Sequence, residues 1–133
     1  MTTVFADTSF YVALTSERDS LHPRAAELLA GHQGGILTTK YVLLEVANFL
    51  RRAAVRQIFT DLMGLIRTDG QSTILPLSDD AFDQGESLFA ARKDKDWSLT
   101  DCISFVVTQE HGITEALTAD HHFEQAGFVA LLK

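Results

Sequence analysis

The sequence has little that would fix a fold covalently or place it in a membrane. It contains one cysteine, Cys102, and two prolines among 133 residues. A single cysteine cannot form an internal disulfide, so an apolar core must hold the chain together. The longest nearly apolar stretches, 41–50 and 102–107, are far shorter than the roughly 20 residues that span a bilayer. With no basic and apolar leader at the N-terminus, we expect a soluble, cytoplasmic protein without membrane contact.

Basic residues are also scarce. Eleven Lys and Arg face 18 Asp and Glu, which gives a net charge of −7. This balance opposes the simplest picture of a nucleic-acid binder, for which a basic patch is expected. Two small basic clusters, 51–56 and 92–95, each follow a predicted helix. Both are equally explained as solvated helix ends, because cations near helix C-termini are common.

What the sequence does contain is a regular alternation of strands and helices. Strands are predicted at 3–6, 36–38, 72–75, 115–118 and 129–132, and helices at 8–14, 23–30, 41–54, 55–67, 78–91, 98–111 and 120–126. Pro76 indicates that the third strand ends there or lies at an edge of the sheet. This order predicts one domain over 1–133, a three-layer α/β/α sandwich around a mostly parallel central sheet.

Four isolated carboxylates interrupt or close apolar segments: Asp7, Glu45, Asp101 and Asp120. Burying an unpaired carboxylate costs several kcal/mol or more, so such groups are usually paired or bound to a cation. In an open parallel sheet, functional residues gather beyond the C-terminal ends of the strands, where the following helices begin. We therefore expect all four to face one crevice. Hard oxygen donors without accompanying cysteine or convergent histidine favour Mg²⁺ or Mn²⁺ over Zn²⁺.

A simpler explanation exists for three of the four. Asp is favoured at helix N-termini for capping alone, which accounts equally well for Asp7, Asp101 and Asp120. Glu45 is neither a cap nor a first-turn residue, although a solvated helix face would accommodate it. Neighbouring polar side chains are candidates for orienting ligands or water, or for simple capping: Thr8, Ser9, Asn48 and Ser98.

Other potential chemistry is weaker. Cys102 begins an apolar helical run and is expected to be a small core residue. His121 and His122 are adjacent, so on a helix they should point in different directions, as surface residues or as supports for the acids. No phosphate-cradling glycine loop or nucleophile elbow occurs in the chain.

Four motifs together resemble the PIN domain family, and more narrowly the VapC-type toxins of bacterial toxin-antitoxin pairs. They are Val-Phe-Ala-Asp7-Thr-Ser, Val-Leu-Leu-Glu45-Val-Ala-Asn, Ser-Leu-Thr-Asp101-Cys-Ile-Ser-Phe and Leu-Thr-Ala-Asp120-His-His-Phe. Each motif is weak alone, but the four in this order cover nearly the whole chain. One departure concerns His122, because some relatives carry another acidic residue there.

The resemblance implies a PIN-like fold and a Mg²⁺- or Mn²⁺-dependent endoribonuclease, with the four acids as its catalytic and metal-binding residues. It also implies an RNA substrate, a cognate antitoxin and a homodimer. Two alternatives remain open on the sequence. One is a degenerate domain of the same family that only binds RNA or protein. The other, a receiver-like signalling domain, would need an acidic pair after the first strand, where Asp7 has no acidic neighbour.

Overall fold

Five parallel strands form the centre of the molecule, and their order explains where polar side chains gather. In the computed structural model, which describes residues 2–133, the order across the sheet is β3-β2-β1-β4-β5. The strands are β1 (Val4–Ala6), β2 (Ile36–Thr39), β3 (Ser72–Leu75), β4 (Glu115–Leu117) and β5 (Val129–Ala130). The connections run in one direction from β1 to β3 and in the other from β4 to β5, so the switch point lies between β1 and β4.

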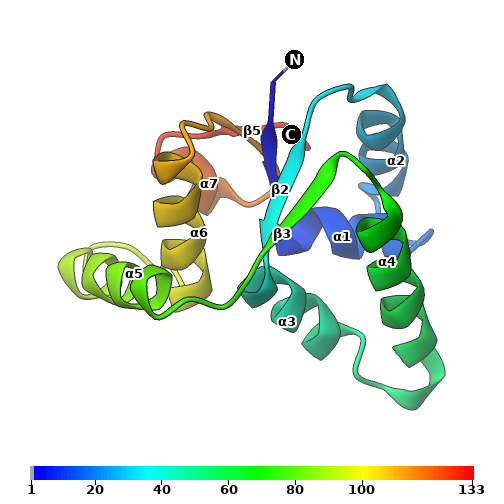
Figure 1. Ribbon diagram of the computed structural model, residues 1–133, viewed down its shortest axis with the longest axis horizontal. Helices are drawn as coiled ribbons and strands as arrows, with labels where there is room; N and C mark the ends of the chain where they lie inside the picture. Colours follow the sequence, from blue (N-terminus) through cyan, green and yellow to red (C-terminus); the bar gives the residue numbers. More distant parts are fainter. Residues whose placement is uncertain (1) are drawn as a thin grey trace.

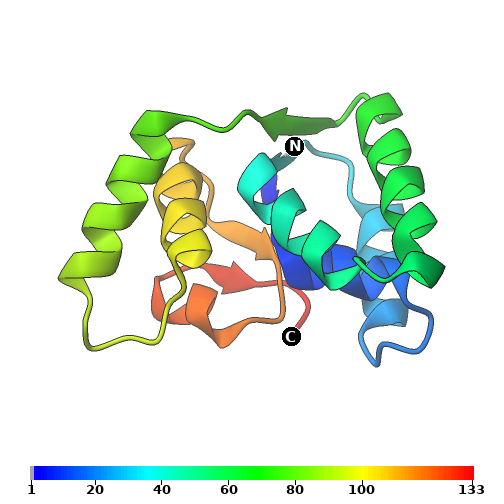
Figure 2. The same ribbon diagram turned by 90° about the horizontal axis from the view of Figure 1, so that it is seen from below.

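The helices cover both faces of the sheet (Figure 1). They are α1 (Thr8–Thr15), α2 (His22–Gly31), α3 (Lys40–Phe49), α4 (Arg56–Thr68), α5 (Asp79–Ala91), α6 (Leu99–Glu110) and α7 (His121–Gln125). The first four gather on one side and the last three on the other, an arrangement that is also visible in the turned view (Figure 2). The predicted three-layer sandwich is confirmed, and every strand pair in residues 2–133 is parallel rather than mostly so.

Most predicted boundaries hold to within two residues, and one does not. The helix predicted over 41–54 ends at Phe49, and a short 3₁₀ turn, Ala53–Val55, leads into α4. Pro76 was expected to mark a strand end or an edge strand, and both apply within residues 2–133, since β3 ends at Leu75 and pairs with β2 alone. Helix stops were expected at Gly112 and Gly127, and both adopt positive φ, +66° and +99°, a conformation that glycine accepts at little cost.

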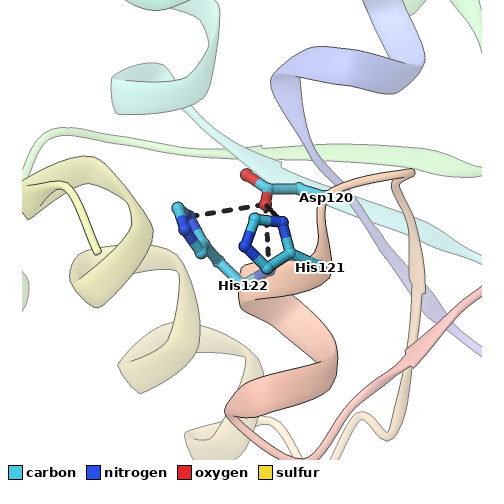
Figure 3. Close-up of side chains that lie close together, drawn as sticks. All are labelled: Asp120, His121 and His122. Atoms are coloured by element: carbon cyan, nitrogen blue, oxygen red, sulfur yellow. Dashed lines mark hydrogen bonds and ion pairs between the residues drawn. The ribbon is translucent and has the colours of Figure 1, made fainter. Parts of the chain in front are cut away.

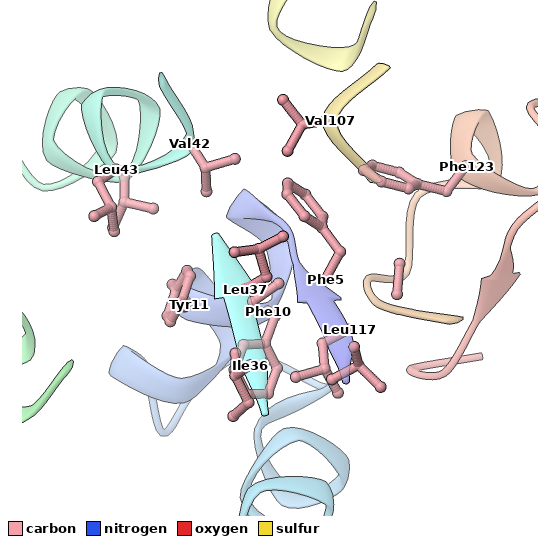
Figure 4. Close-up of a cluster of buried hydrophobic side chains, with 14 of the residues drawn as sticks. Phe5, Phe10, Tyr11, Ile36, Leu37, Val42, Leu43, Val107, Leu117 and Phe123 are labelled. Atoms are coloured by element: carbon pink, nitrogen blue, oxygen red, sulfur yellow. The ribbon is translucent and has the colours of Figure 1, made fainter. Parts of the chain in front are cut away.

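The core lies where the two helical layers meet the sheet (Figure 4). Phe5 of β1 is fully buried and stacks on Phe123 of α7, with ring centroids 6.1 Å apart. Phe105 of α6 meets Phe123 edge-on at 4.8 Å. Cys102 is fully buried, as predicted for a core residue. These contacts fix α6 and α7 against the centre of the sheet, beside the switch point.

Within residues 2–133, no helix combines the length and apolarity that a bilayer crossing requires.

Candidate metal centre at the switch point

The polar side chains singled out from the sequence meet at the carboxyl ends of β1 and β4. Asp7 directly follows β1, and its backbone N–H donates to the carbonyl of Leu117, the last residue of β4, at 3.1 Å. Asp120 comes three residues after β4 and starts α7. These two strands are neighbours whose onward connections diverge, which is where functional residues gather in an open parallel sheet.

Asp7 is the most buried of the four carboxylates, with an exposed fraction of 5%. Its Oδ2 accepts hydrogen bonds from the hydroxyls of Thr118, at 2.9 Å, and Ser9, at 3.3 Å. Burial is the main cause that raises the pKa of Asp7 to about 6, while hydrogen bonds from the Thr8 backbone and the Thr118 hydroxyl act against it and the charges of Asp101 and Asp120 add smaller increases. Asp7 occupies the N-cap position of α1 but makes no capping bond. Capping therefore does not explain this residue, whereas a bound cation would stabilise its charged form.

Asp101 and Asp120 both cap helices, so the simpler explanation holds for them in part. The side chain of Asp101 accepts from the backbone of Ser98 at 3.1 Å, while Ser98 Oγ accepts from the backbone of Asp101, forming a capping box on α6. Asp120 Oδ1 accepts from the backbone N–H of His122 at 2.9 Å. Burial is the main cause that raises the pKa of Asp101, with the charge of Asp120 adding to it. The charge of Asp120 thus affects the pKa of Asp101, in addition to the capping hydrogen bond that each carboxylate makes.

The two histidines lie closer together than the sequence suggested. Their ring centroids are 4.3 Å apart, and both Nδ1 atoms approach Asp120 Oδ1, at 3.6 Å for His121 and 3.4 Å for His122 (Figure 3). The prediction that they diverge was wrong because they sit in the first turn of α7, directly after Asp120, where both rings can turn back toward the capping carboxylate. His122 Nδ1 also lies 3.2 Å from Asp101 Oδ2.

Glu45 stands at one side of this group and is held through Thr8. The Thr8 hydroxyl donates to Glu45 Oε1 at 2.6 Å, which links α3 to the residue after Asp7. Asn48 was expected to orient Glu45, but its side chain is exposed and no hydrogen bond joins the two within residues 2–133. The orienting partner of Glu45 is therefore Thr8, one of the four polar neighbours named from the sequence.

Two residues of the network were missed or undervalued. Thr118 is fully buried and bridges the two strands, since its hydroxyl donates to Asp7 and accepts from the backbone of Asp120 at 3.0 Å. A threonine two residues before a strand-end aspartate was the available signal. His122 was treated as a departure from the pattern, although its place between Asp101 and Asp120 makes it part of the site.

The donor set fits a divalent cation. Within residues 2–133, one set of three acidic or histidine side chains has ligand atoms all within 4.8 Å of one another, namely Asp120, His121 and His122. The four carboxylates do not form such a set, because hydrogen bonds to Thr8, Thr118 and Ser98 hold three of them in separate positions. The charges of Asp101 and Asp120 nevertheless add to the raised pKa of Asp7, so the three carboxylates are close enough to repel one another.

A cavity of about 640 Å³ lies elsewhere in the molecule and contains none of the four acids. Its walls come from α1, α2 and α4 and are mainly apolar, with Leu14, Ile58, Leu62 and Leu65 among the lining residues. The four acids and this cavity are therefore on different parts of the molecule. We therefore place the candidate metal site at the switch point. We call the cavity between α1, α2 and α4 the apolar groove and consider it as a surface for contact with another molecule.

A parallel α/β sandwich with carboxylates gathered at its switch point defines the class of this domain, an α/β fold with an acidic group at one edge of its sheet. Comparison with known proteins identifies the family, since residues 4–129 match the model of the PIN domain. The chain belongs to the PIN domain family. It is 30% identical over 131 residues, 95% of each chain, to the 23S rRNA-specific endonuclease VapC20 of Mycobacterium tuberculosis.

Solved structures agree with this assignment. The crystal structure of VapC20, described as a Sarcin-Ricin loop cleaving toxin, superposes with a TM-score of 0.86 at 27% identity, covering 95% of this chain and 96% of that one. A toxin-antitoxin complex from Klebsiella pneumoniae has a TM-score of 0.68 at 20% identity over 96% and 97% of the two chains. FitAcB from Neisseria gonorrhoeae has a TM-score of 0.65 at 15% identity over 96% and 94%. The last two show the fold alone.

Proposed function

We propose that this protein is a Mg²⁺- or Mn²⁺-dependent endoribonuclease and the toxin of a toxin-antitoxin pair. The observation that carries the proposal is the convergence of Asp7, Asp101 and Asp120 at the switch point. It is supported by the 30% identity to a 23S rRNA-specific endonuclease over nearly the whole chain. A domain that only binds RNA or protein would not require a buried carboxylate with a raised pKa, such as Asp7, at the carboxyl ends of the strands.

The proposed reaction is hydrolysis of an RNA phosphodiester bond. Asp7, Asp101 and Asp120 would hold the divalent ion, which supplies a bound water of lowered pKa and neutralises charge on the phosphate oxygens. Thr118 and Ser9 fix the orientation of the Asp7 carboxylate by donating to its Oδ2, so that its other oxygen can face the ion.

Glu45 is the proposed general base. The Thr8 hydroxyl occupies Glu45 Oε1 and leaves Oε2 to accept the proton from the attacking water. Glu45 is partly exposed, and it lies on a different helix from Asp101 and Asp120. Its role is therefore separate from theirs, with the metal held on one side of the crevice and the proton accepted on the other.

The decisive experiment is cleavage of a labelled RNA pool that includes large-subunit ribosomal RNA, with Mg²⁺, Mn²⁺ or EDTA. The Asp101→Asn variant should lose on the order of 10²-fold or more in rate, because it removes one charge from the ion's surroundings. Asp83→Asn, an exposed acid of α5, is the matched control and should cleave like the wild type. Equal cleavage in EDTA, or by Asp101→Asn, would contradict the proposal. Metal and RNA binding without any cleavage would favour the binding module instead.

The partners we propose are an antitoxin and a second copy of the chain. Large apolar side chains are exposed on the helices predicted to face a partner: Leu44 and Phe49 of α3, 53% and 60% exposed, and Leu65 of α4, 69% exposed. Leu65 also lines the apolar groove, which suits an amphipathic antitoxin helix, whereas the α3 residues lie outside it and suit a dimer contact.

Two charge substitutions separate these partner surfaces. Phe49→Glu should convert a dimer to monomer in solution while leaving the antitoxin complex intact, and Leu65→Glu should do the reverse. Light scattering of the isolated chain and co-purification with its antitoxin measure the two outcomes. A monomeric wild type would refute the homodimer, and an unaffected complex in Leu65→Glu would refute the groove as the antitoxin surface.

A further inference from the structure

His122 bridges two carboxylates that come from different helices. Its Nδ1 lies 3.2 Å from Asp101 Oδ2 at the start of α6 and 3.4 Å from Asp120 Oδ1 at the start of α7. The side chain is only 19% exposed, and that of Asp101 is 12% exposed. His122 Nδ1 therefore lies near one oxygen of each carboxylate, and Figure 3 shows the imidazole turned toward Asp120.

These separations are those expected of neighbouring ligands on one ion. Octahedral sites for small divalent ions hold their ligands at about 2.1 Å, so adjacent ligand atoms lie about 3 Å apart. The distances from His122 Nδ1 to its two carboxylate partners are close to that value. A metal ion could therefore take the place of these contacts at His122 Nδ1, and an Asp120 oxygen already lies near both rings.

The residues that follow His122 are packed into the core, which holds the backbone that carries its side chain. The next residue, Phe123, is fully buried against Phe5 and Phe105. One turn further on, Gln125 Oε1 accepts from the indole N–H of the buried Trp97 at 3.0 Å. His121 differs from His122, because its side chain is 63% exposed and touches only Asp120 among the acids.

We propose that His122 binds the catalytic divalent ion through Nδ1, together with Asp101 and Asp120, and that it biases the site toward Mn²⁺ over Mg²⁺. Imidazole suits transition metals, whereas Mg²⁺ prefers oxygen donors throughout. The proposal rests on the metal-dependent nuclease proposed above. It assigns a ligand and a metal preference to a position where an all-carboxylate site would have an oxygen.

The test is spectroscopic and does not need turnover. Mn²⁺ bound to the full chain should show the ¹⁴N coupling of a directly bound imidazole in pulsed electron paramagnetic resonance. His122→Gln should lose this coupling, and His121→Gln, the matched control, should retain it. Titration calorimetry should show the ratio of Mn²⁺ to Mg²⁺ affinity falling about tenfold in His122→Asp, which restores an all-oxygen donor set.

Each outcome decides the assignment. Bound Mn²⁺ without nitrogen coupling, loss of the coupling in His121→Gln rather than His122→Gln, or an unchanged affinity ratio in His122→Asp would overturn it. RNA cleavage in such samples would leave the nuclease proposal standing. Nitrogen coupling in a protein that cleaves no RNA would support the His122 ligand and contradict the nuclease. Thermal unfolding of each variant shows that it is folded when measured.

Discussion

Replacing Asp7 by Asn should make the metal-free protein more stable while abolishing its activity. Asp7 is 5% exposed, and burial raises its pKa from 3.8 to about 6. The ionised carboxylate is therefore destabilising in the folded chain at neutral pH. Since one pKa unit corresponds to about 1.4 kcal/mol, the full effect is about 3 kcal/mol. Asn keeps an acceptor for the Thr118 hydroxyl and removes the charge.

The sign follows from proton linkage. The folded protein binds the Asp7 proton more tightly than the unfolded chain, so stability is retained below about pH 4 and is lost as pH rises toward 6. Above pH 6 the loss is complete. The stability difference between Asp7→Asn and wild type should accordingly grow between pH 4 and pH 6 and stay constant above. Other titrating groups largely cancel in this difference.

Thermal unfolding in EDTA measures the effect. If about two thirds of the 3 kcal/mol is recovered, an unfolding entropy of about 2 cal/mol/K per residue predicts a gain of roughly 7 °C at pH 7.5. At pH 4.5 the gain should be much smaller. Mn²⁺ should raise the melting temperature of wild type more than that of Asp7→Asn, which lacks one of the proposed ligands. An Asn variant less stable than wild type at pH 7.5, or a difference that does not vary with pH, would refute the reasoning.

Two further predictions concern the supports of the site and of the fold. Thr8→Val removes the hydroxyl that orients Glu45, so the rate of RNA cleavage should fall ten- to a hundredfold, as expected for loss of a hydrogen bond to a charged group worth about 1.5 to 3 kcal/mol. Thr8→Ser, which keeps a hydroxyl, should restore the rate. An unchanged rate in Thr8→Val would exclude Glu45 as an oriented base. Gly85→Ala would place a methyl group 2.3 Å from Ile103 Cγ1, which should destabilise the chain by about 1 to 3 kcal/mol in urea unfolding. Gly64→Ala, in open space on α4, should instead stabilise it by up to about 1 kcal/mol, and equal effects of the two would contradict the packing between α5 and α6.

Local patterns in the sequence were sufficient for most of the fold. Short apolar runs ending in Asp7 or Pro76 predicted strands, and alternation with helices predicted the parallel sheet and its edge. The end of α3 at Phe49 was missed, because the run through Ala54 contains no glycine or proline to stop it. The chain turns toward α4 after Phe49, and no local feature of the sequence predicts that turn.

The candidate site was also only partly predictable from local patterns in the sequence. Its members were predictable from isolated charges in apolar surroundings, and so was the edge of the sheet at which they lie. Their partners were not, because hydrogen bonds such as Thr118 to Asp7 and His122 to Asp101 join residues 111 and 21 positions apart. Residue type indicates that a carboxylate needs a partner, but only the packing of α6 and α7 decides which side chain provides it.

The separation of 111 residues between Asp7 and Thr118 also bears on when the protein becomes active. The carboxylate that starts the site is made first, but β4 and α7, which complete it, are made last. During synthesis a growing chain carries Asp7 without Thr118, Asp120 or His122, and sequence-distant pairings of this kind form late in folding. The growing chain therefore lacks the complete group of site residues until its final quarter has been made, so the site can assemble only when synthesis is nearly finished.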